Sequence, residues 1–100
     1  MFGLFKSKKK EIIKKYLEQD AQLLDVRTAS EFNGDHIDGS INIPVQAVSR
    51  NMDQLDKNKP VIVYCAMGGR SNVAASKLKA QGFKVANAGG IGSMRKHLKS

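Results

Sequence analysis

The stretch VIVYCAMGGRS, residues 61–71, places the only cysteine of the chain, Cys65, directly after four apolar residues that favour β-structure. Two glycines, an arginine and a serine follow, and a helical pattern of apolar residues then continues to about Gly82. This order is typical of a buried strand, a tight loop and the N-terminus of a helix. Cys65 is therefore predicted to lie at the carboxyl end of a strand, beside a helix N-terminus.

Two interpretations of Cys65 are open at this point. In the first, converging backbone N–H groups and the helix dipole stabilise its thiolate and make it a nucleophile. Gly68 and Gly69 support this interpretation, because positive φ angles would turn the loop amides inward as an anion-binding nest. Arg70 would add a fixed positive charge at the rim. In the second interpretation, Cys65 is a buried structural thiol that ends the strand. The composition of the loop favours the nucleophile.

The length and composition indicate one globular domain. A chain of 100 residues can build a single core, and its 41% hydrophobic and 26% charged residues are typical of globular proteins. No apolar run approaches the roughly 18 residues that cross a bilayer, and the apolar start of the chain is too short for the core of a secretory signal. We therefore expect a cytoplasmic protein without a stable membrane anchor.

The cysteine count limits the chemistry. A single cysteine excludes an internal disulfide and an internal resolving thiol. In addition to this cysteine the chain has only two histidines, His36 and His97, which do not make a ligand set for zinc or iron. We therefore expect neither a metal nor another cofactor. Sulfur or redox chemistry at Cys65 would have to be completed by a second molecule, either a small nucleophile or a partner thiol protein.

The chain is strongly basic, with a formal net charge of +8 that comes in part from a lysine cluster near the start of the chain and from Arg95, Lys96 and Lys99 near its end. No aromatic residues are interleaved with these clusters, so we expect solvated surface and no nucleic-acid partner. A general positive field would still raise the local concentration of an anionic substrate.

Short apolar strands alternate with helical patterns along the chain. Residues 1–7 are predicted to be a mobile basic arm, and residues 8–100 a single domain that begins with an amphipathic helix at 8–18. We expect a monomer with a three-layer α/β/α sandwich and a central, mostly parallel sheet of four to five short strands. The strands are predicted at 23–26, just before Pro44, at 61–65 and at 83–87. A capping box at Thr28 and Glu31 predicts the start of a second helix. Further helices are predicted from Pro44 to Leu55, from the Cys65 loop to Gly82, and from Ile91 after a turn at Gly89-Gly90.

Three separated segments carry a specific combination of motifs. They are the Cys65 loop with its glycines and Arg70-Ser71, the pattern LDVR at 24–27, EF at 31–32, HI at 36–37 and GSINIP at 39–44, and GGI at 89–91. This combination covers most of the chain and resembles the rhodanese-like sulfurtransferase family. The tryptophan that the family commonly has near Met94 is absent here, which concerns only local packing or the wall of the pocket.

The resemblance implies a rhodanese-like fold and a thiosulfate sulfurtransferase that acts through a persulfide on Cys65. It implies a small anionic sulfur donor such as thiosulfate, and cyanide or a thiol as the acceptor. By the same resemblance, Asp25 and Arg27 support the loop through charge-assisted hydrogen bonds, and the alternative for them is an ordinary surface ion pair. The residues that would bind the substrate and hold the persulfide are Ala66, Met67, Gly68, Gly69, Arg70 and Ser71.

Other functions of cysteine loops are open as alternatives. Cysteine phosphatases and arsenate reductases place five residues between Cys and Arg, whereas four residues separate Cys65 from Arg70. The shorter loop makes a smaller cradle, which suits one sulfur atom better than a tetrahedral phosphate. The main alternative is a sulfur carrier or binding module of the same fold that does not turn over by itself and needs a partner protein.

Overall fold

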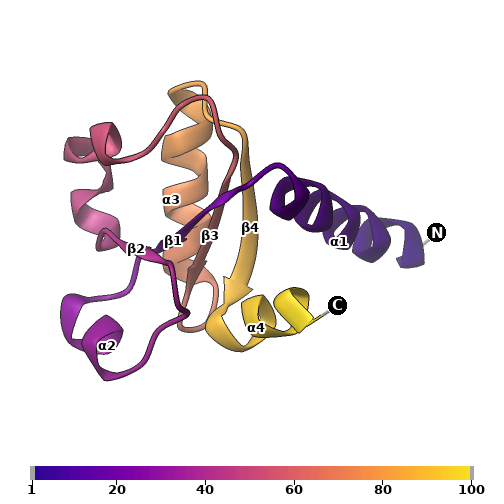
Figure 1. The fold of residues 1–100 in the computed structure, drawn as a ribbon, viewed down its shortest axis with the longest axis horizontal. Coiled ribbons are helices and arrows are strands. Elements are labelled where there is room, and N and C mark those ends of the chain that lie inside the picture. Colours follow the sequence, from indigo (N-terminus) through magenta and orange to yellow (C-terminus); the bar gives the residue numbers. More distant parts are fainter. Residues whose placement is uncertain (1, 100) are drawn as a thin grey trace.

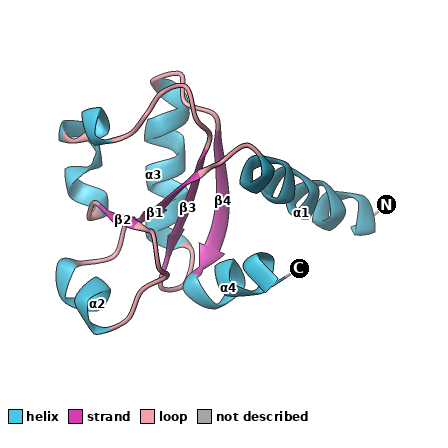
Figure 2. Ribbon diagram, in the orientation of Figure 1, coloured by secondary structure: helices cyan, strands magenta, loops and turns pink. Residues whose placement is uncertain are grey.

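The computed structural model describes residues 2–99, with side chains placed over residues 8–99. Four parallel strands form one sheet in the spatial order β2-β1-β3-β4, and helices cover both of its faces (Figure 1; Figure 2). The elements are α1 (Phe2–Glu18), β1 (Gln22–Asp25), α2 (Ala29–Gly34), β2 (Ile41–Asn42), the 3-10 helices η1 (Val45–Arg50) and η2 (Met52–Gln54), β3 (Val61–Cys65), α3 (Gly69–Ala80), β4 (Val85–Gly90) and α4 (Ile91–Lys99).

Strand β3 is one of the two inner strands of the sheet, and all five of its residues are buried. Strand β1 brings Asp25 beside Tyr64, and β4 brings Gly90 beside Cys65. A strand that is buried on both faces needs a continuous apolar run instead of an alternating pattern, and the sequence VIVYC supplies it. This run places Cys65 at the carboxyl edge of the sheet.

Alternate residues of β3 point into two separate cores. Val61, Val63 and Cys65 pack on the face that α3 and η1 cover. Ile62 and Tyr64 pack on the opposite face, under α1 and α4. The predicted three-layer α/β/α sandwich with a parallel sheet is therefore confirmed.

Helix α2 begins with the capping box predicted at Thr28 and Glu31. The Glu31 N–H donates to Thr28 Oγ1 at 3.1 Å, and the Thr28 N–H donates to Glu31 Oε1 at 3.0 Å. Helices α2 and α4 both lie at the carboxyl edge of the sheet, on the side where β3 ends (Figure 1). The cap therefore holds the Glu31 carboxylate near the end of β3.

The single helix predicted from Pro44 to Leu55 is wrong. The segment forms two 3-10 helices that meet at Asn51, whose φ of −128° and ψ of 23° depart from helical values. Asn51 Nδ2 donates to the Ala47 carbonyl at 2.8 Å, and such local bonds compete with the backbone bonds of an α-helix. Val48 is nevertheless buried, so the apolar spacing identified the inward face correctly.

Strand β4 also differs from the prediction. It begins at Val85 instead of Phe83 and continues through Gly90, so the turn predicted at Gly89-Gly90 lies within the strand. A shift in the β3–β4 register follows Val63, and Gly89 adopts a φ of +83° that favours glycine. The irregular strand end runs beside the Cys65 loop.

The backbone of α1 begins at Phe2 instead of Lys8. Met1 and the side chains of residues 2–7 lie outside the described residues, so the mobility predicted for residues 1–7 stays a prediction. Over the described residues, no helix, α1 included, combines the length and the apolar character that crossing a membrane requires.

Candidate active site

The loop after β3 is shaped by one glycine in a left-handed conformation. Gly68 caps the N-terminus of α3 with a φ of +108°, which a residue with a Cβ rarely adopts. Gly69 was also predicted to need a positive φ, but it is the first residue of α3 and is not in that region. A single left-handed turn therefore folds the loop back over the end of β3.

Backbone amides of this loop point at the Cys65 sulfur. The Gly68 N–H lies 2.9 Å and the Ser71 N–H 3.3 Å from Cys65 Sγ. The Cys65 residue is only 1% exposed and belongs to the core on the α3 side. The thiol is therefore buried, as the structural interpretation expects, yet it is surrounded by donors, as the nucleophile interpretation expects.

Ser71 adds a hydroxyl to this environment. Its Oγ lies 3.4 Å from Cys65 Sγ, and its O–H donates to the Gly68 carbonyl at 3.0 Å, with the Gly89 carbonyl 3.4 Å away. Burial raises the pKa of the Cys65 thiol, but the contact with the Ser71 side chain and hydrogen bonds from the N–H groups of Ser71, Gly68 and Met67 together hold that pKa below its usual value. The site thus favours the thiolate, which is the reactive form of cysteine.

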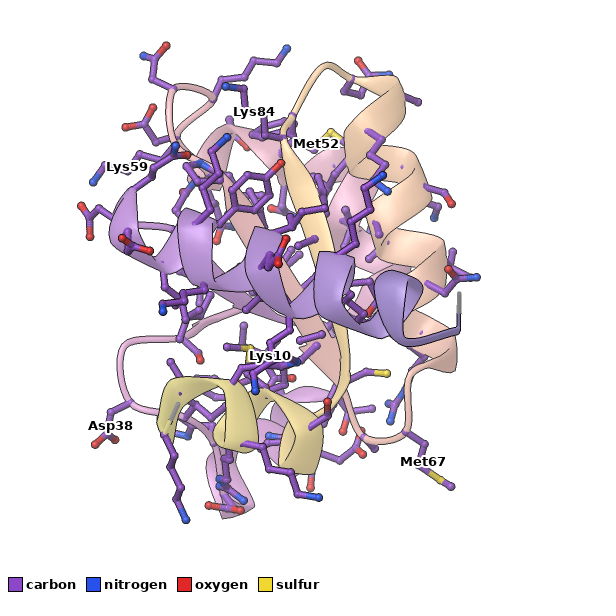
Figure 3. All side chains as sticks on the ribbon, turned by 90° about the vertical axis from the view of Figure 1, so that its right-hand side faces the viewer. Lys10, Asp38, Met52, Lys59, Met67 and Lys84 are labelled. Atoms are coloured by element: carbon purple, nitrogen blue, oxygen red, sulfur yellow. The ribbon has the colours of Figure 1, made fainter. Side chains whose placement is uncertain are left out.

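The end of β4 supports the loop from beneath. A Cβ atom on Gly90 would lie 2.7 Å from the Ala66 carbonyl oxygen, so only glycine lets the two backbones approach this closely. Met67 lies at the outer end of the loop with 94% of its surface exposed, and it points away from the domain (Figure 3). The loop therefore packs closely on the end of β4 and exposes Met67 to solvent.

Arg70 does not project freely at the rim of the loop. Its Nη1 and Nη2 atoms bind Glu31 Oε1 at 2.7 Å and Oε2 at 3.1 Å, and both side chains are 35% exposed. Hydrogen bonding to Arg70 and to the Thr28 backbone lowers the pKa of Glu31 to about 2, so the pair is charged at neutral pH. The spacing of Thr28 and Glu31 predicted only the cap, because the contact between Glu31 and Arg70 joins residues 39 positions apart and leaves no local pattern.

Asp25 and Arg27 form a buried pair, not a surface ion pair. Arg27 Nε lies 3.0 Å from both carboxylate oxygens of Asp25, and Arg27 Nη2 lies 2.8 Å from Oδ2. The guanidinium also donates to the Asp35 carbonyl, and Asn42 Nδ2 donates to the carbonyls of Asp25 and Arg27 at 3.0 Å each. The hydrogen bonds described for the pair thus join β1 to β2 and to the segment after α2. None of them reaches the Cys65 loop, so the support of that loop by Asp25 and Arg27 stays a prediction.

No metal centre accompanies the cysteine in the part of the chain that the structure describes. Residues 2–99 contain no cluster of three or more histidine, cysteine or carboxylate side chains that could hold an ion. The chemistry that these residues supply is a buried sulfur, inward-facing N–H groups and a paired arginine.

The sequence and the fold of the chain are similar to those of known proteins. A model of the rhodanese-like domain matches residues 9–95. The chain is 35% identical to "Thiosulfate sulfurtransferase GlpE" of Shewanella oneidensis over 65 residues, which covers 65% of this chain and 64% of that protein. It is 37% identical over 76 residues to "Putative sulfur carrier protein YrkF" of Bacillus subtilis, which covers 74% of this chain and 41% of the relative.

A solved structure described as "rhodanese with anions from E. coli" superimposes with a TM-score of 0.68 at 36% identity, covering 73% of this chain and 89% of the other. The chain spans less than two thirds of the length of the two curated relatives above. The family model nevertheless covers most of the chain, including both motif segments and the Cys65 loop. The chain belongs to the rhodanese-like domain family.

Proposed function

We propose that the protein is a sulfurtransferase that moves a sulfane sulfur from a small anionic donor, such as thiosulfate, to a thiophilic acceptor. The observation that carries this proposal is the pair of N–H groups, from Gly68 and Ser71, aimed at Cys65 Sγ. Family membership supports the same function, since one relative is named a thiosulfate sulfurtransferase.

In the first step, the Cys65 thiolate attacks the outer sulfur of the donor. With thiosulfate, a new S–S bond forms to Cys65, the S–S bond of thiosulfate breaks, and sulfite leaves with the bonding electron pair. The persulfide that remains carries its negative charge on the outer sulfur. Loop amides and the N-terminus of α3 stabilise that charge, and their preorganisation costs no rearrangement during the reaction.

In the second step, the acceptor attacks the outer sulfur and regenerates the Cys65 thiolate. Cyanide would leave as thiocyanate, and a thiol would leave as a persulfide. Cys65 is the only cysteine of the chain, so no internal thiol can take up the sulfur, and the acceptor comes from another molecule. We place this reaction in the cytoplasm of the cell, with the chain as a monomer.

Turnover of thiosulfate and cyanide tests the proposal. Double-displacement chemistry predicts parallel lines in double-reciprocal plots, because each substrate reacts with a different form of the enzyme. Cys65→Ser should abolish turnover, and Ser76→Ala, an exposed change on α3, should leave it unchanged. Full turnover by the Cys65→Ser variant would exclude the proposal.

A sulfur carrier is the second candidate, and the relative named a putative sulfur carrier favours it. A carrier would take up one sulfur on Cys65 but would release it only to a specific partner protein, which would supply the missing thiol. Stoichiometric loading without turnover on cyanide or small thiols, followed by release to a partner thiol protein, would favour the carrier over the enzyme.

A further inference from the structure

The Glu31–Arg70 pair links helix α2 to the first turn of α3, beside the reactive loop. Arg70 follows Cys65 by five positions, and the charge on Cys65 is among the groups that raise the pKa of Arg70, so its guanidinium lies within electrostatic reach of an anion at the loop. In the structure its charge is already matched by Glu31 through two hydrogen bonds. An anion that approaches Cys65 therefore meets a paired arginine instead of a free one.

Glu31 is held in place by more than Arg70. Its Oε1 atom also accepts hydrogen bonds from the Thr28 N–H at 3.0 Å and from Thr28 Oγ1 at 3.1 Å. The carboxylate is thus anchored by the cap of α2 before it contacts Arg70. The arginine side chain is the more adjustable partner, because it has no second anchor among its described hydrogen bonds.

We propose that Glu31 sets the charge selectivity of the Cys65 site by holding Arg70 in this pair. Glu31 is a positioning residue in this account, since it acts on an incoming anion through Arg70. Removing its charge should free the guanidinium and favour anionic over neutral reagents at Cys65. The proposal deepens the sulfurtransferase function but can be tested without it.

Glu31→Gln is the variant that isolates the charge. Glutamine keeps an oxygen at the same position and preserves a capping box, so α2 should remain intact. The readout is the ratio of Cys65 alkylation rates by iodoacetate, an anion, and iodoacetamide, its neutral analogue. We expect the ratio to rise by about threefold to fivefold in the variant, a size typical of a half-exposed charge, and to return toward the parent value at high salt.

Three further variants separate charge selectivity from structural damage. Glu11→Gln removes the same charge from an exposed position on α1 and should leave the ratio unchanged. Thr28→Val removes the hydroxyl contact but keeps the Glu31 carboxylate and the N–H of residue 28 that binds it, so the ratio should change much less than in Glu31→Gln. Glu31→Asp, which keeps the charge, should also stay closer to the parent than Glu31→Gln. A ratio that does not change in Glu31→Gln, or that rises equally in Thr28→Val, would overturn the proposal.

Turnover gives an independent readout. In Glu31→Gln the KM for thiosulfate should fall while kcat stays within about twofold, because the freed arginine improves binding of the anion more than the chemistry. Failure of turnover in the parent protein would contradict the sulfurtransferase function and leave the alkylation ratio as the test of Glu31. An unchanged KM in an active variant would count against Glu31 alone.

Discussion

Two arginine–carboxylate pairs lie at the carboxyl edge of the same sheet, and they differ in burial. The Asp25–Arg27 pair is almost completely buried, whereas the Glu31–Arg70 side chains are each 35% exposed. A buried pair is costly to break because its remaining partner keeps an uncompensated charge away from water. A half-exposed pair can exchange its partner for water or for a substrate anion. From this difference in burial we expect the first pair to stabilise the scaffold and the second to take part at the site.

Asp25→Ala should give the largest effect on stability. The variant leaves the Arg27 guanidinium buried without its carboxylate, which typically costs about 3–5 kcal/mol of the free energy of unfolding. For a domain of this size the thermal midpoint should fall by more than about 10 °C. Differential scanning calorimetry measures this directly. A midpoint within a few degrees of the parent would show that the buried pair is not the scaffold element described here.

Gly90→Ala tests the close approach between the end of β4 and the Cys65 loop. The new Cβ would lie 2.7 Å from a backbone oxygen that has no rotamer to adopt, so we expect a loss of about 1–3 kcal/mol and slower alkylation of Cys65. Gly92→Ala, where a Cβ meets nothing within 4 Å, is the matched control and should not slow alkylation. Equal behaviour of the two variants in urea unfolding and alkylation would refute the close approach.

Ser71→Ala should change reactivity more than stability. It removes the hydroxyl near Cys65 Sγ and keeps the backbone N–H, so the pKa of the thiol should rise toward its ordinary value. The pH profile of alkylation should show a midpoint below that of a free thiol in the parent and a higher midpoint in the variant. Ser76→Ala should have the same midpoint as the parent. A Ser71→Ala midpoint equal to that of the parent would show that the Ser71 hydroxyl does not lower the pKa of Cys65.

The smallest effect concerns the stability that Glu31 contributes. Its pKa in the folded protein is about 2, below its ordinary value of 4.5. A depressed pKa means that the contribution is complete above about pH 4.5 and is lost as the pH falls toward 2. The difference in thermal midpoint between the parent and Glu31→Gln should therefore shrink over this range. A difference that is the same at pH 6 and pH 2 would contradict an ionised pair.

Local sequence patterns predicted the features that depend on neighbouring residues. The apolar run before Cys65 identified the central strand, and the spacing of Thr28 and Glu31 identified the cap of α2. Features that depend on the assembled fold could not be read in this way. The contact of Arg70 with Glu31 requires α2 to lie beside the start of α3, and the role of Gly90 requires β4 to run under the loop.

The break between η1 and η2 at Asn51 was not predicted for a different reason. The apolar spacing from Val45 to Leu55 fits an α-helix, and it does predict the buried face. The hydrogen bond from the Asn51 side chain to the Ala47 carbonyl, however, competes with the backbone hydrogen bonds of an α-helix, and the spacing of apolar residues does not indicate it. Burial of Asp25 could not be predicted either, because charged residues are mostly exposed unless their partners are already in place.

The central claim is that loop amides lower the pKa of the buried Cys65 thiol and that this sulfur can hold a second sulfur atom. Mass spectrometry of the protein after treatment with thiosulfate and removal of excess reagent tests it most directly. The account predicts one added sulfur atom, located on the Cys65 peptide and lost on addition of cyanide. An unchanged mass under conditions in which Cys65 is still alkylated by iodoacetamide would contradict it.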